Sequence, residues 1–166
     1  MNVDSLKRIA MLVVLCLVQA LVLNQVHLFG IATPLLYVYF VLLYRRGEPR
    51  WALLLWSFLL GVVIDTFSNT PGVAAASMTL MGLLQPYLLA PFIPRDSAED
   101  LQPSMRTLGV TQYIYYTVIV TFLYCLLFFT LEMFTFYNWQ EWLATIGSSW
   151  LLTVVLILVI ENFRSK

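Results

Sequence analysis

Long apolar blocks dominate this sequence and limit what it can fold into. Six can be read along the 166 residues, at about 9–23, 28–44, 51–67, 71–93, 108–131 and 142–160. A helix that crosses a bilayer needs roughly 20 mostly apolar residues. With 61% hydrophobic and 11% charged residues, the chain has too few polar side chains to cover a water-soluble surface. We therefore expect an all-α fold, a polytopic membrane helix bundle of about six transmembrane helices that makes residues 1–166 a single integral-membrane domain.

The basic residues predict how this bundle is oriented. With six crossings, all nine fall on one side of the membrane, namely Lys7, Arg8, Arg45, Arg46, Arg50, Arg95, Arg106, Arg164 and Lys166. The loops expected on the other side, at 24–30, 68–70 and 132–141, contain no Lys or Arg. Cytoplasmic loops are the ones enriched in Lys and Arg, so the N- and C-termini are both predicted to be cytoplasmic. Net charge is zero, and this excludes a basic field for nucleic acid.

The first block has a second interpretation. Lys7 and Arg8, a short apolar run and Val18-Gln19-Ala20 loosely resemble a cleavable signal peptide. Cleavage there would leave the sidedness of the chain unchanged. The site lacks the usual small residue three positions before the cut, so an uncleaved first span is the expectation.

Catalytic chemistry has little support in this sequence. His27 is the only histidine, so a metal site or a Ser-His pair would depend on it alone. Asp65 is the only carboxylate inside a predicted span, whereas an aspartyl protease needs two; Glu161 is expected to snorkel to water at the end of the last span. Cys16 and Cys125 are expected to be buried thiols. We predict no enzymatic activity, cofactor or metal.

The turn between the third and fourth blocks holds the candidate site, a structural or interface motif made of Gly61, Asp65, Asn69, Thr70, Pro71 and Gly72. Gly61 lies one helical turn before Asp65 and permits close helix approach. Pro71 suits the first position of the next helix, and Thr70 or Asn69 suits its N-cap. Asp65 would then staple the turn beside a helix N-terminus, or else contact a substrate or carry a proton. If it only caps, Asp65→Asn should retain abundance and function.

In size, hydropathy pattern and this turn, the chain resembles the MreD family of bacterial rod shape-determining membrane proteins. The most specific features are Gly61, Asp65, Pro71 and Gly72, followed by the small residues 74–77. The turn residues 67–70 depart from many members of that family. The resemblance implies a fold similar to the substrate-binding component of energy-coupling vitamin transporters.

The resemblance also implies a function and a location. It implies a non-enzymatic scaffold in the bacterial cytoplasmic (inner) membrane, where lateral peptidoglycan is synthesised and rod shape is maintained. Its expected partners are MreC and, directly or indirectly, MreB, RodA and a penicillin-binding transpeptidase, besides the lipid bilayer; a homodimer is left open. The alternative is a small-molecule-binding component of an energy-coupling transporter, in which Asp65, Asn69, Thr70 and Asn138 would line a cavity.

Overall fold

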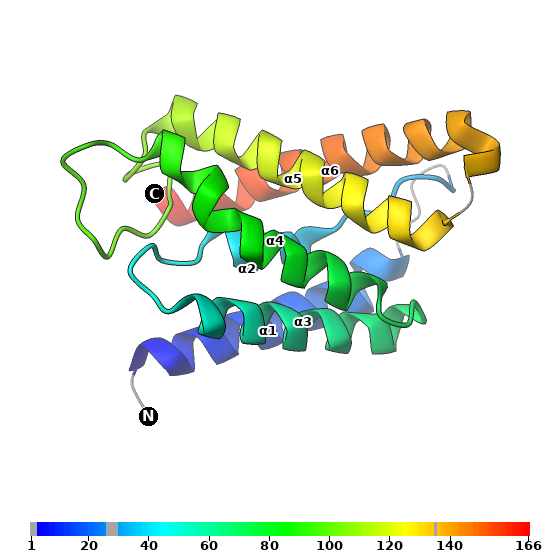
Figure 1. The fold of residues 1–166 in the computed structure, drawn as a ribbon, viewed down its shortest axis with the longest axis horizontal. Helices are drawn as coiled ribbons and strands as arrows, with labels where there is room; N and C mark the ends of the chain where they lie inside the picture. Colours follow the sequence, from blue (N-terminus) through cyan, green and yellow to red (C-terminus); the bar gives the residue numbers. More distant parts are fainter. Residues whose placement is uncertain (1–2, 26–29, 135) are drawn as a thin grey trace.

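The computed structural model describes residues 3–25, 30–134 and 136–166, and these form an all-helical bundle (Figure 1). The helices are α1 (Val3–Leu21), α2 (Tyr39–Leu42), α3 (Arg50–Ser68), α4 (Val73–Leu89), α5 (Val110–Met133) and α6 (Trp139–Ser165). Short 3-10 turns are η1 (Leu23–Gln25), η2 (Leu36–Val38), η3 (Ala90–Phe92) and η4 (Phe136–Asn138). His27 and the expected start of the second span, at residues 28 and 29, lie outside the described residues.

Four helices are long and apolar enough to cross a membrane. Within the described residues they are α3, α4 with its η3 extension, α5 and α6, and they cover the third to sixth apolar blocks. Large apolar side chains such as Phe58, Leu83, Phe122 and Leu151 are exposed on their outer faces. A water-soluble bundle would not expose such a surface, whereas lipid tails cover it at no cost. α1 has three charged residues, Asp4, Lys7 and Arg8, in its first two turns and is not one of the four.

Both termini lie at the same end of the bundle, on the left in Figure 1. We call this the termini end, and the opposite end, where α3 turns into α4, the Asp65 end. All nine Lys and Arg residues belong to segments at the termini end. These segments are the start of α1, the loop before α3, the start of α3, residues 93–109 (here called the connector before α5) and the end of α6. The structure thus gathers on one end the charges that the sequence predicted to share one side.

The predicted continuous helix over residues 28–44 is wrong. Of the described part, only the turn η2 and the four-residue helix α2 are helical. Residues 32–44, here called the central segment, are buried throughout except for the half-buried Thr33. The apolar run therefore reflects burial inside protein and does not reflect a helix surrounded by lipid.

The five long helices pack in neighbouring pairs around the central segment. α1 packs on α3, α3 on α4, α4 on α5 and α5 on α6, and the central segment contacts α1, α4 and α6 through η2 and α2. Figure 1 shows α2 between α1 and α3 on one side and α5 and α6 on the other. Fully buried Tyr37 and Leu42 of this segment belong to the same core as Leu60 of α3 and Tyr124 of α5. The central segment is therefore the centre of the molecule's packing.

Candidate functional site

Asp65 is the residue that joins α3 to α4. Its carboxylate is buried, with 7% of the residue exposed. One oxygen, Oδ1, accepts the backbone N–H of Ala74 at 2.8 Å and the Thr70 hydroxyl at 3.0 Å, and the other, Oδ2, accepts the N–H of Ala75 at 2.9 Å. These two N–H groups belong to the first turn of α4, where no intrahelical acceptor exists. The anion also lies at the positive end of the helix dipole. Asp65 thus caps α4 from the preceding helix.

The turn between the helices differs from its prediction in two respects, because Pro71 is not the first residue of α4 and neither Asn69 nor Thr70 is its N-cap. α4 begins at Val73, and its N-cap residue is Gly72, with φ of 84° and no side chain to cap with; neither Asn69 nor Thr70 holds that position. Asn69 ends α3 in the left-handed conformation, with φ of 56°, which asparagine tolerates better than most residues. Pro71 lies within the turn, ahead of the helix. Because a glycine N-cap offers no oxygen, the cap has to come from Asp65.

Gly61 brings the two helices into backbone contact. A Cβ placed there would lie 2.7 Å from the carbonyl oxygen of Ala74 and 2.7 Å from the N–H nitrogen of Ala75. Gly82 approaches α3 in the same way further along, where a Cβ would lie 3.1 Å from Ser57 Oγ. Small residues allow this spacing, which van der Waals packing then stabilises. Gly61 and Asp65 therefore fix one hairpin, the first by contact and the second by hydrogen bonds.

The geometry changes the expectation for Asp65→Asn. The prediction that an amide would cap equally well assumed a single accepting oxygen. Here both carboxylate oxygens accept a backbone N–H, from Ala74 and Ala75. An asparagine has one accepting oxygen and would turn its NH₂ group toward the other N–H. The structure thus predicts that Asp65→Asn is destabilising even though Asp65 has a structural role.

A shallow groove runs along the outer face of this hairpin. It has a volume of about 390 Å³ and is lined by Phe58, Val62, Asp65, Thr66, Asn69, Pro71, Gly72 and Ala75. Phe58 and Val62 are 48% and 40% exposed, so the groove is open to whatever surrounds the bundle. Five of the six residues of the predicted motif contribute to this surface or to the cap behind it, and Gly61 sets the spacing beneath it.

Three polar side chains hold the irregular backbone of the central segment. Buried Gln19 of α1 donates from Nε2 to the carbonyl of Pro34 at 2.9 Å and accepts the N–H of Leu36 at 3.1 Å. From α6, Ser149 Oγ accepts the N–H of Thr33, and Thr153 Oγ1 accepts the N–H of Leu35, each at 3.1 Å. Non-helical backbone at membrane depth survives only where protein satisfies it.

Further contacts fix the rest of the central segment. The hydroxyl of Tyr124 in α5 donates to that of Tyr37 at 2.6 Å, with both rings fully buried. Gln85 of α4 donates to the Tyr44 carbonyl at 3.4 Å and to the Tyr116 hydroxyl at 3.3 Å. Gln19 and Gln85 are both polar residues within apolar blocks of the sequence, and neither was assigned a structural role from the sequence. Their position was the available signal, because a polar side chain inside a membrane needs a partner.

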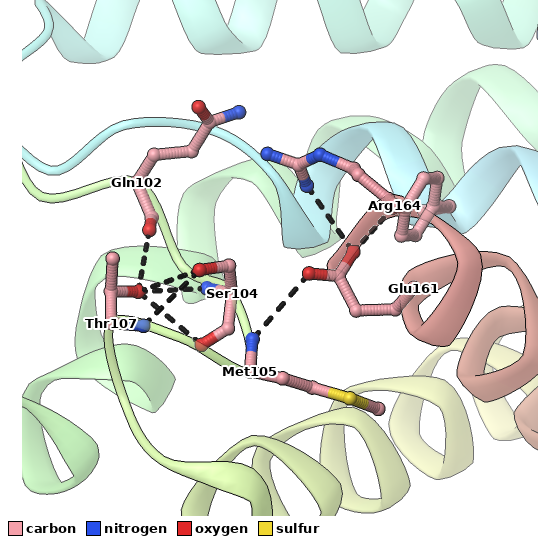
Figure 2. Close-up of polar contacts among 7 residues, drawn as sticks. Gln102, Ser104, Met105, Thr107, Glu161 and Arg164 are labelled. Carbon is pink, nitrogen blue, oxygen red and sulfur yellow. Dashed lines mark hydrogen bonds and ion pairs between the residues drawn. The ribbon is translucent and has the colours of Figure 1, made fainter. Parts of the chain in front are cut away.

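Glu161 closes the termini end of the bundle. It was expected to snorkel into water, and this is wrong, since it is 1% exposed. Its carboxylate accepts the Tyr39 hydroxyl at 2.6 Å and the N–H of Met105 at 3.4 Å, and it pairs with Arg164 at 3.2 Å. Figure 2 shows Glu161 pointing from α6 toward Met105, with Arg164 beside it. The connector before α5 folds back over α6, and this return of the chain buries the carboxylate.

Hydrogen bonds within the connector hold its backbone, in addition to the bond between Met105 and Glu161. The Thr107 hydroxyl donates to the Gln102 carbonyl at 2.8 Å and accepts the N–H of Ser104 at 2.9 Å, as Figure 2 shows. Such a side-chain-bonded turn is a usual device of Ser and Thr in loops. Part of the connector is therefore a folded cover for the end of α6.

The described residues contain no cluster of His, Cys, Asp or Glu side chains placed to hold a metal ion. Cys16 and Cys125 are free and buried, as predicted.

Comparison with known proteins returned no match at any level, whether to a family model, to a curated protein or to a solved structure. The functional interpretation therefore depends on the site geometry and on the sequence resemblance described above.

Proposed function

We propose that this chain is a non-enzymatic membrane scaffold of the bacterial cell-wall elongation machinery, a protein of the MreD type. In this proposal it lies in the inner membrane with both termini in the cytoplasm. α1 and the central segment make the first two of its six passages, and α3 to α6 make the rest. MreC is its direct partner, and MreB, RodA and a penicillin-binding transpeptidase associate with the same assembly.

One observation carries the proposal: the hairpin of α3 and α4 is rigid at its core and open on its outer face. Gly61 and the bonds of Asp65 to Ala74 and Ala75 fix the spacing of the two helices. The groove of about 390 Å³ on their outer face combines exposed Phe58 and Val62 with small and polar residues. Helix pairs in membranes associate through such surfaces, where packing and a few polar contacts replace the hydrophobic effect. A partner's single transmembrane helix fits this description.

The shape and size of the hollows at the Asp65 end favour a scaffold over a transporter component. The groove of about 390 Å³ is shallow and open on its outer face, so it would not enclose a small molecule. The more enclosed cavity at this end measures about 220 Å³ and is lined mainly by apolar and aromatic side chains, with Thr33, Thr70 and Glu132 among its polar residues. Pockets that hold small organic molecules usually measure about 300–1,000 Å³. The buried polar groups Gln19, Ser149 and Thr153, which a binder would need for its ligand, are engaged with backbone.

The test is a pull-down of the tagged chain from its native membrane in a gentle detergent, with partners identified by mass spectrometry. The informative variant is Val62→Trp, which fills the groove, and its matched control is Val155→Trp, at an exposed valine of α6. We expect wild type and Val155→Trp to recover a single-span MreC-like protein and the wall synthases. Val62→Trp should insert normally and lose them.

Two outcomes would overturn the proposal. One is recovery of a paired cytosolic ATPase with a transmembrane coupling subunit, which would identify a transporter component. The other is equal partner recovery by Val62→Trp and Val155→Trp, which would remove the groove from the interaction.

A further inference from the structure

A second cavity lies between α3 and α4 at the termini end of the bundle. It measures about 400 Å³ and is lined by the start of α3, the end of α4 with η3, and the chain at 44–50 and 93–95. The two helices are in contact near Gly61 and spread apart toward this end, as Figure 1 shows. The cavity occupies the space that this divergence leaves, at the opposite end of the hairpin from the groove described above.

The walls of this cavity are strongly basic. Four arginines line it: Arg45, Arg46, Arg50 and Arg95. The acidic residue among the lining side chains is Glu48, and its carboxylate is already ion-paired with Arg8 of α1. The positive charge of the cavity is therefore not cancelled from within.

Two of the four guanidinium groups are free to bind a ligand. Arg45 lies 3.8 Å from the carboxylate of Asp4, and Arg50 donates to a tyrosine hydroxyl of α4 at 3.4 Å. In the part of the chain that the structure describes, the side chains of Arg46 and Arg95 have neither a hydrogen bond nor an ion pair. An arginine presents five N–H donors in a planar fork, which matches two oxygens of a phosphate group.

The rest of the lining is mostly apolar, and its polar residues besides Glu48 are Tyr44 and Gln85. The Tyr44 hydroxyl is buried and has no hydrogen-bond partner among the described residues. Gln85 is buried and makes only long hydrogen bonds of 3.3 and 3.4 Å. The apolar lining residues, here called the apolar floor, include Leu53, Leu89, Ala90 and Ile93. Arginines beside an apolar floor match an amphiphile with an anionic head, and they match a small hydrophilic ion less well.

We propose that this cavity binds the phosphate head of an anionic membrane lipid, with Arg46 and Arg95 on the phosphate oxygens and the first carbons of the acyl chains over the apolar floor. Basic pockets between membrane helices recognise lipid heads by this combination. The inference is independent of the scaffold proposal, because it uses other residues at the other end of the hairpin. The same phosphate chemistry could come from a soluble phosphate, and the experiment separates the two sources.

The experiment measures lipid binding to the full-length chain, purified in a neutral detergent, by native mass spectrometry. The probes are phosphatidylglycerol, phosphatidic acid, zwitterionic phosphatidylcholine and inorganic phosphate. The cavity pair is Arg46→Gln with Arg95→Gln. Its matched control is Arg106→Gln with Lys166→Gln, which removes the same charge from the same end outside the cavity. Arg46→Lys with Arg95→Lys keeps the charge and loses the planar fork.

We expect the wild type to bind the two anionic lipids and to prefer them to phosphatidylcholine. Each arginine at an anionic surface contributes about fivefold in affinity, so the cavity pair should lose about 25-fold. The control pair should change affinity by less than about threefold, since neither Arg106 nor Lys166 lines the cavity. The lysine pair should fall between the two. Full competition by millimolar inorganic phosphate would identify a soluble phosphate as the occupant and overturn the lipid proposal.

Ala90→Trp gives a test that leaves the charge unchanged. Ala90 is an exposed residue of the apolar floor, so an indole there should fill the cavity without disturbing the core. Loss of lipid binding in Ala90→Trp would support the site even if the arginine pair proved unstable. Equal losses in the cavity and control pairs, or phosphatidylcholine binding as tightly as phosphatidylglycerol, would overturn it.

Discussion

The cap that Asp65 places on α4 gives the sharpest prediction. Asp65→Asn keeps the size and polarity of the side chain and removes one of its two accepting oxygens. In the wild type those oxygens receive the N–H groups of Ala74 and Ala75 and the hydroxyl of Thr70. The variant can satisfy one of the two N–H groups, and its own NH₂ faces the other.

The cost of this change follows from two effects. A buried N–H left without an acceptor costs about 1–3 kcal/mol. Removing an anion from the N-terminus of a partly buried helix costs about 0.3–2 kcal/mol. Together they predict that Asp65→Asn lowers the free energy of unfolding by about 1–5 kcal/mol. Asp65→Ala removes both acceptors and should cost more. Thr70→Val removes only the hydroxyl donor and should cost about 1 kcal/mol.

The assay is reversible unfolding of the purified chain in mixed micelles, in which sodium dodecyl sulfate is titrated and helicity is followed by far-UV circular dichroism. Thr66→Ala is the matched control. Thr66 is the exposed neighbour of Asp65, and its hydroxyl bonds only the Val62 carbonyl of its own helix, at 2.9 Å. It should change stability by less than about 0.5 kcal/mol. If Asp65→Asn unfolds at the wild-type detergent ratio, the two-oxygen cap described here is wrong.

Three further predictions concern other contacts. Gln19→Leu leaves one carbonyl and one N–H of the central segment unpaired, so it should cost about 2–4 kcal/mol in the same titration. Gln140→Leu, at an exposed glutamine, should be neutral. Equal stability of the two variants would contradict the role of the Gln19 amide. Gly61→Ala puts a methyl group 2.7 Å from a carbonyl oxygen of α4, so it should lower the stability of the fold by about 1–3 kcal/mol. Gly147→Ala, with open space around it, should raise the stability by about 0.5–1 kcal/mol. A neutral Gly61→Ala would show that the hairpin can open freely. Glu161→Ala releases the connector before α5, so limited proteolysis within the connector should speed up severalfold. An unchanged rate of cleavage would mean that the Glu161 carboxylate does not hold the connector.

The helices α3 to α6 could be predicted because each is an apolar block of spanning length between polar turns. The second block looked the same, but its described part is not one continuous helix. Apolar content reports burial, and burial by lipid and burial by protein give the same sequence signal. The distinguishing signs were outside the block, in Gln19 of α1 and in Ser149 and Thr153 of α6, whose partners only the fold identifies.

The candidate site was predictable in outline. The position of Asp65 before a turn, with Gly61 one helical turn earlier, indicated a cap and a close helix contact. It could not reveal that Gly72 is the N-cap or that both carboxylate oxygens are used, because these depend on the path of the turn. Glu161 was misjudged for a related reason. Its burial depends on a connector more than 50 residues away, since Met105 lies 56 positions before it.

The way the central segment is held also constrains how the chain is made. Its backbone bonds come from Gln19, synthesised before it, and from Ser149 and Thr153, synthesised more than a hundred residues after it. Until α6 has left the ribosome and entered the membrane, the N–H groups of Thr33 and Leu35 have no partner from the native fold. A nascent chain that stops short of α6 would therefore leave this backbone unpaired in the interior of the bundle, at a cost for each unpaired group. α6, which is made after the other described helices, completes the middle of the molecule.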